Sequence, residues 1–229
     1  MDQQNKGILH RLWDRERGPY ALLVITAVTV FVTSPLVVSG AVSPVALDVF
    51  FAVFLFVGVL TVHPGRGLRL RYLVLVLAIF SLLMRIASNF VLNRAVLLTE
   101  NLIGSAAIAI FGSLVMKQFL VSGRRAAHRI VAAIVVYLLI GVLWARLYEI
   151  AGLMIPGAFN IANGTATITS YLYFSFVTLA TIGYGDITPV HSVVRNLAVL
   201  EAITGQMYIA VLIAQLVASS RLAAGSGKD

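Results

Sequence analysis

Six long apolar stretches, separated by short polar segments, constrain the fold of this 229-residue chain more than any other feature. A bilayer core about 30 Å thick requires roughly 20 mainly apolar residues for each crossing helix. Each stretch is near that length, and charged residues make up only 11% of the chain, fewer than half of the roughly 25% that is usual in a soluble domain. The sequence therefore predicts an all-α integral membrane protein with six transmembrane helices, over Tyr20–Val38, Pro44–Val62, Tyr72–Ser88, Val96–Leu120, Ile130–Ile150 and Ser192–Ala218.

Basic residues gather in alternate segments between the apolar stretches. They precede the first stretch, separate the second from the third and the fourth from the fifth, and follow the sixth, whereas the opposite side receives little more than Arg94 and Arg195. Because Lys and Arg accumulate on the cytoplasmic side of membrane proteins, both termini are predicted to lie in the cytoplasm and the protein in the cell (inner or plasma) membrane. The same distribution accounts for the net charge of +8 without a nucleic-acid partner.

Composition excludes several classes of chemistry. The chain has no cysteine, which rules out a disulfide framework, a thiol nucleophile and a cysteine zinc site. Its four histidines are not spaced as metal ligands, and no set of serine, histidine and carboxylate indicates catalysis. We therefore predict that the protein is not an enzyme and needs no cofactor.

A seventh apolar stretch, at about Thr165–Ala180, is too short to cross a bilayer. It lies between the fifth and sixth predicted helices, on the outer side. Backbone at membrane depth that is not helical persists only where protein or a water-filled cavity satisfies its polar groups. This stretch is therefore predicted to be a re-entrant helix that leads into a pore loop.

The residues that end and follow the re-entrant stretch carry the strongest functional signal. They read Thr178-Leu179-Ala180-Thr181-Ile182-Gly183-Tyr184-Gly185-Asp186. Glycine reaches positive φ without a steric penalty, so alternating glycines allow successive backbone carbonyls to point to one side. The segment resembles the signature filter of potassium channels, and the chain from about Arg129 to Val217 resembles the pore unit of the superfamily with six transmembrane segments and a single pore loop.

The resemblance implies a function and a set of site residues. It implies passive, potassium-selective conduction by a homotetramer in the lipid bilayer, because one loop cannot encircle an ion. The implied selectivity filter is Thr181, Ile182, Gly183, Tyr184 and Gly185, with K⁺ held at Thr181, Ile182, Gly183 and Tyr184. The implied support comes from Tyr173, Phe174, Thr178, Asp186 and Glu201, with the Tyr184 hydroxyl reaching the preceding helix near Tyr173 and Phe174.

The sixth predicted helix is expected to line the cavity below the filter. Gln206, Ile209 and Ile213 recur at helical spacing on one face, with Gln206 nearest the filter. Gly205 matches the position of a hinge glycine in the family. These four residues are the predicted cavity and gate.

Glu201 lies on the same helix but, at about 100° per residue, it points away from the cavity face. Its depth places it near Ser175 and Thr178 of the pore helix, whose hydroxyls are expected hydrogen-bond partners. The sequence leaves open whether this carboxyl braces the filter, in either protonation state, or only fixes helix packing.

A basic linker divides the chain into two membrane units. The predicted organisation is a cytoplasmic segment (1–19), a sensor-like four-helix domain (20–122), a linker with the pore domain (123–218) and a cytoplasmic tail (219–229). A voltage-sensing fourth helix carries regularly spaced arginines, whereas Val96–Met116 contains no Lys or Arg. Strong voltage gating is therefore not expected.

Ionisable residues inside the predicted helices require partners because charge is costly in a bilayer. Asp48, Arg85 and Glu100 are predicted to form a structural polar cluster. Arg146 and Glu149 are predicted to form an ion pair at the outer membrane interface, within an aromatic belt that includes Tyr148.

Two other functions stay open at this stage. The chain can be a non-conducting modulatory or assembly subunit that keeps the filter sequence, or a weakly selective cation channel of the same fold. The presence of both Tyr184 and Asp186 disfavours the weakly selective channel.

Overall fold

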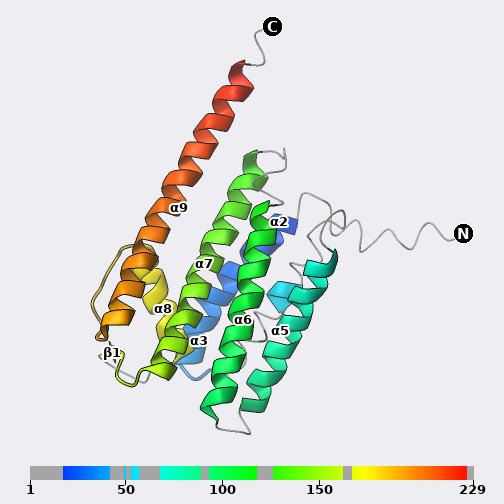
Figure 1. Ribbon diagram of the computed structural model, residues 1–229. Coiled ribbons are helices and arrows are strands. Elements are labelled where there is room, and N and C mark those ends of the chain that lie inside the picture. Colours follow the sequence, from blue (N-terminus) through cyan, green and yellow to red (C-terminus); the bar gives the residue numbers. More distant parts are fainter. Residues whose placement is uncertain are drawn as a thin grey trace, which may run out of the picture.

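The computed structural model describes residues 18–41, 49, 53–56, 68–88, 93–117, 126–161 and 167–225. This part of the chain is mostly helical (Figure 1). The helices are α2 (Gly18–Ala27), a π-helical segment (Val28–Thr33), α3 (Ser34–Val38), α5 (Leu68–Ser88), α6 (Arg94–Val115), α7 (Ala126–Met154), α8 (Ile168–Leu179) and α9 (Ser192–Gly225). Two short strands, β1 (Phe159–Ile161) and β2 (Ile187–Pro189), are an addition to the all-α prediction.

Three helices are long and apolar enough to cross a membrane within the described residues, over Arg94–Val115, Arg129–Met154 and Ser192–Ala218. They correspond to the fourth, fifth and sixth predicted spans. The third predicted span coincides with α5, whose apolar part is Tyr72–Met84. Most of the second span lies outside the described residues. The protein is therefore a multi-pass membrane protein by the composition and length of these helices.

The first predicted span is interrupted. α2 passes into a π-helical segment at Val28, and α3 begins at Ser34. Pro35, the second residue of α3, has no backbone N–H and cannot donate the hydrogen bond that would continue a regular helix through this point. The proline thus accounts for a change of helix type where the sequence predicted one continuous helix.

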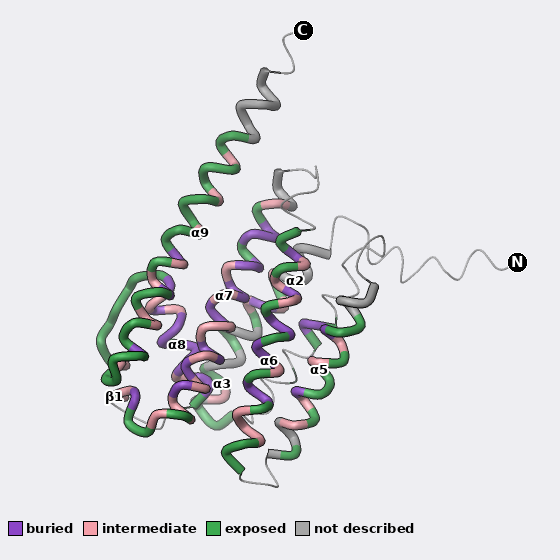
Figure 2. The backbone as a smooth tube through the Cα atoms, viewed as in Figure 1, coloured by how far each residue is buried: buried purple, intermediate pink, exposed green. Residues whose placement is uncertain are grey.

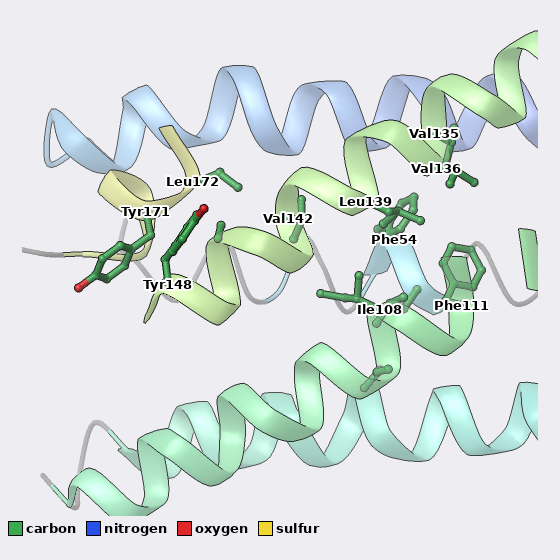
Figure 3. Close-up of a cluster of buried hydrophobic side chains, with 14 of the residues drawn as sticks. Phe54, Ile108, Phe111, Val135, Val136, Leu139, Val142, Tyr148, Tyr171 and Leu172 are labelled. Atoms are coloured by element: carbon green, nitrogen blue, oxygen red, sulfur yellow. The ribbon is translucent and has the colours of Figure 1, made fainter. Parts of the chain in front are cut away.

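α7 is the central helix of the structure. It packs against α2, α6, α8 and α9 (Figures 1 and 2). Figure 3 shows the core between α7 and the N-terminal helices, where Leu139 faces Phe54 and Phe111, whose ring centroids lie 5.4 Å apart. By contrast, α9 extends away from the bundle and is mostly exposed, as Figure 2 shows.

The predicted ion pair between Arg146 and Glu149 is present, but Arg146 is buried and has a closer partner. Arg146 is only 4% exposed, and its Nη1 lies 2.9 Å from Glu100 Oε1 of α6 but 3.9 Å from Glu149. The same nitrogen donates to Asn101 at 3.2 Å, and Ser81 of α5 donates to Glu100 at 3.2 Å. Sequence spacing does not reveal that α6 covers this face of α7 and supplies the closer partner.

The predicted polar cluster of Asp48, Arg85 and Glu100 is only partly visible. Asp48 and the side chain of Arg85 lie outside the described residues. Glu100 is fully buried and joins α5, α6 and α7 through the contacts just given. A buried charge is tolerated where it is paired and hydrogen-bonded, and this carboxylate meets that condition.

The strands pair antiparallel on the side of the molecule where α7 ends and α9 begins. Phe159 of β1 lies opposite Pro189 of β2, and Val190 N donates to Ala158 O at 2.8 Å. The pairing joins the segment after α7 to the segment before α9, and so fixes both ends of the loop that contains α8.

Candidate functional site

The candidate site is the loop between α8 and β2. α8 begins after Thr167, whose side chain accepts a hydrogen bond from Ser170 N at 3.4 Å and caps the helix. The helix ends at Leu179, and the loop Ala180–Asp186 follows before β2 starts. Thr181 to Asp186 are all exposed in the single chain.

The backbone of this loop alternates in handedness. φ is positive at Thr181 (55°), Gly183 (62°) and Gly185 (82°), but not at Ile182 or Tyr184 between them. Alternation between left- and right-handed conformations brings successive N–H groups to one edge of a chain and successive carbonyls to the other. This alternation is compatible with the row of carbonyl oxygens that the alternating glycines predict. Thr181 is a β-branched residue at positive φ, an uncommon conformation that marks a constrained segment.

The N-terminal end of the loop is hydrogen-bonded to the last turn of α8. Thr181 N donates to Thr178 O at 2.9 Å, and Ile182 N and Gly183 N both point to Val177 O, at 2.8 and 3.4 Å. Thr178 thus contacts the loop through its backbone carbonyl. Since the terminal carbonyls of α8 hold the loop, the position of α8 sets the position of the loop.

Two side chains from other helices reach this junction. Gln206 Nε2 of α9 donates to Thr181 Oγ1 at 3.2 Å, which places Gln206 beside the N-terminal end of the loop. Tyr137 Oη of α7 donates to Leu179 O at 3.4 Å. Sequence reasoning missed Tyr137, because nothing in its local pattern distinguishes it from other aromatic residues of a spanning helix.

Gly205 is buried against the end of α8, in direct contact with the Leu179 carbonyl. α9 continues as a helix through this position, and the predicted hinge at Gly205 stays a prediction. Ile209 and Ile213 lie exposed farther along α9. Gln206 is also exposed in the single chain.

The Tyr184 hydroxyl is predicted to reach the preceding helix near Tyr173, and the two tyrosines lie close enough to interact electrostatically. Tyr184 is 69% exposed, and the hydroxyl bonded at this place is that of Tyr173, which donates to Asp186. Phe174 belongs instead to a buried aromatic cluster, with its ring 4.9 Å from Tyr148 and 5.6 Å from Phe159. α8 turns Phe174 toward α7, whereas Tyr173 faces outward beside the loop.

Glu201 is fully buried and contacts α8 as predicted. Its Oε1 lies 2.5 Å from Ser175 Oγ of α8, and its Oε2 accepts a hydrogen bond from Tyr148 Oη of α7 at 2.5 Å. Thr178 is not among its hydrogen-bond partners. Tyr148, which the sequence assigned to an aromatic belt, is fully buried and was missed as a partner.

Comparison with known protein families finds a match over this region. Residues 130–219 match a family described as "Ion channel", and they include most of α7, all of α8, the loop and most of α9. Residues 130–219 are thus similar to an ion-channel domain.

A relative among curated proteins is also named as a channel. The chain is 32% identical over 98 residues to a protein of Arabidopsis thaliana named "Two-pore potassium channel 3". The match covers 42% of this chain and 20% of that relative, so the chain spans about a fifth of the relative's length. No solved structure matches the chain significantly. The matched family and the named relative are both channels.

Proposed function

We propose that this protein is a potassium-selective channel that conducts K⁺ passively. The observation that carries the proposal is the alternation of positive φ at Thr181, Gly183 and Gly185 in a loop that reads Thr-Ile-Gly-Tyr-Gly. A potassium ion loses its water shell only where fixed oxygens replace it, and rows of backbone carbonyls supply them in potassium channels. The Thr181 hydroxyl adds an oxygen at the inner end of the row.

Four copies of the chain complete the channel in this proposal. One loop supplies carbonyls on one side of an ion only, so conduction needs several loops around an axis. Two features of the single chain support assembly: the loop is exposed on its Tyr184 side, and α9 exposes a run of large apolar side chains that includes Ile203, Met207 and Ile209. Contact with neighbouring copies would cover part of this apolar surface.

The remaining parts of the proposal concern topology and gating. The proposed channel has six spans, with α8 and its loop re-entering from the outer side, and lies in the cell membrane. The alternation of basic segments supports a cytoplasmic position for both termini. α6 has no Lys or Arg after Arg94, so this helix carries no row of gating charges.

Flux through the purified protein tests the function. Protein reconstituted in liposomes should pass K⁺ or Rb⁺ far faster than Na⁺, and its mass in detergent should be that of four chains. Equal K⁺ and Na⁺ flux would identify a weakly selective cation channel. No flux from a verified four-chain assembly would favour the modulatory subunit.

A further inference from the structure

Glu201 joins three helices at a single carboxyl group. It lies on α9, it contacts Ser175 Oγ of α8 at 2.5 Å, and it accepts from Tyr148 Oη of α7 at 2.5 Å. Ser175 Oγ also lies 2.7 Å from Gly141 O of α7. All three side chains are fully buried.

The hydrogen atoms available for these contacts can be counted. The three short contacts are Tyr148 with Glu201, Glu201 with Ser175, and Ser175 with Gly141 O, and each needs one hydrogen. The tyrosine and serine hydroxyls supply one each, and a backbone carbonyl supplies none. The third hydrogen is therefore on the carboxyl of Glu201.

One arrangement satisfies every contact. Tyr148 donates to Glu201 Oε2, Ser175 donates to Gly141 O, and the protonated Oε1 of Glu201 donates to Ser175 Oγ. With an ionised carboxylate, Ser175 would have to donate to Glu201, and two acceptor oxygens would then face each other at the 2.7 Å contact with Gly141. Both recorded partners of the carboxyl are uncharged hydroxyls, and burial of an ionised carboxylate without a cationic partner is costly.

We propose that Glu201 is a neutral carboxylic acid and that, together with Tyr148, it is a positioning residue for the filter. The inference rests on the proposed function, because it assigns the loop Thr181–Gly185 as the conducting element. Ser175 lies in the same helix as Val177 and Thr178, whose carbonyls hold the backbone N–H groups of Thr181, Ile182 and Gly183. Glu201 thus acts on the filter through α8.

A second contact makes the joint rigid. Gly205 follows Glu201 by one helical turn on α9, and Leu179 follows Ser175 by one turn on α8. Glu201 bonds to Ser175, while Gly205 touches the Leu179 carbonyl. The two contacts lie one helical turn apart on both helices, so they fix both the position and the tilt of the end of α8. The filter backbone is hydrogen-bonded to this end.

Substitutions at Glu201 and Tyr148 test the positioning role. Glu201→Gln keeps one donor and one acceptor, so its K⁺-over-Na⁺ flux ratio should stay within about twofold of wild type, because the buried hydrogen bonds remain. Glu201→Leu and Tyr148→Phe each remove a buried hydrogen bond, so the ratio should fall by about tenfold. A four-chain assembly that still forms in each variant separates this effect from failure to fold.

Infrared spectroscopy of the purified protein tests the neutral acid without requiring conduction. Wild type at neutral pH should show the carbonyl stretch of a protonated carboxyl. This band should disappear in Glu201→Gln and persist in Glu100→Gln, a matched control because Glu100 is equally buried but pairs with Arg146.

The possible outcomes are distinguishable. Absence of the band from wild type, or its persistence in Glu201→Gln, would overturn the neutral acid. Wild-type selectivity in Glu201→Leu would overturn the positioning role. Equal K⁺ and Na⁺ flux in wild type would refute the proposed function instead, and the infrared band would still decide the state of Glu201.

Discussion

Gly205 of α9 touches the carbonyl of Leu179 at the end of α8, so closely that a Cβ atom at position 205 would collide with that oxygen. The proposed filter, Thr181–Gly185, begins two residues after Leu179 and is hydrogen-bonded to the same helix end. The glycine therefore permits α9, a continuous helix at this position, to approach the base of this loop.

Replacing this glycine tests the close approach. Gly205→Ala should destabilise the protein by about 1–3 kcal/mol, as overpacking of a tight contact does, and should reduce K⁺ flux. Thermal unfolding and liposome flux measure the two effects. Gly112→Ala is the matched control, because a Cβ atom there would lie 3.8 Å from Leu139 and the change should be neutral or stabilising. Equal changes of stability and flux in the two variants would contradict the close contact between Gly205 and the Leu179 carbonyl.

Gly183→Ala tests the filter backbone. A Cβ atom at Gly183 meets nothing within 4 Å, so the effect should come from its φ of 62° alone, at about 1–2 kcal/mol of conformational strain. Selective flux should be lost while membrane insertion persists. Gly157→Ala, with a φ of 73° and equally open space, should show the same strain but normal selectivity. Potassium-selective reversal potentials in Gly183→Ala would refute the assignment of the filter.

Arg146 should be more important for stability than its position near a helix end suggests. Arg146→Gln leaves the buried Glu100 without its cationic partner at 2.9 Å and should cost about 3–5 kcal/mol. The double variant Glu100→Gln, Arg146→Gln should be less destabilised than the sum of the two single variants, as urea unfolding in detergent can measure. Lys117→Gln, at an exposed residue, is the control and should change little. Additive single effects would contradict a direct pair.

Voltage should have little effect on opening. Val96–Met116 contains no basic residue, and each charge that crosses the field contributes only about 2.3 kcal/mol per 100 mV. Single-channel open probability in planar bilayers should therefore change little over a range of about 200 mV. Steep activation would show that other residues supply gating charge.

Ile213 should line the inner cavity. It is 56% exposed on α9, and the chain has no native cysteine, so Ile213→Cys can be labelled without background. A cytoplasmic thiol reagent should modify this cysteine and reduce the current. Ala132→Cys, at a residue only 1% exposed in α7, should not react. Protection of Ile213→Cys in every functional state would place another face of α9 toward the pore.

Much of the architecture follows from local properties of the chain. The length of the apolar stretches predicted α6, α7 and α9, and the shorter stretch predicted α8. The spacing of Gly183 and Gly185 predicted a loop with alternating conformations, because only glycine adopts positive φ without strain. Helical periodicity placed Glu201 away from the cavity face and toward α8, where it bonds to Ser175.

The partners of individual side chains depended on tertiary packing. Arg146 pairs with Glu100 across α6 and α7, Tyr148 bonds to Glu201, and Gln206 reaches Thr181, and none of these contacts is local. In a soluble helix an apolar stripe marks the buried face. In a membrane protein the faces that contact lipid and the faces that contact other helices are both apolar, so the pattern along α6, α7 and α9 does not show which faces meet. Only the packed helices decide that, and with it the hydrogen bonds that hold the filter.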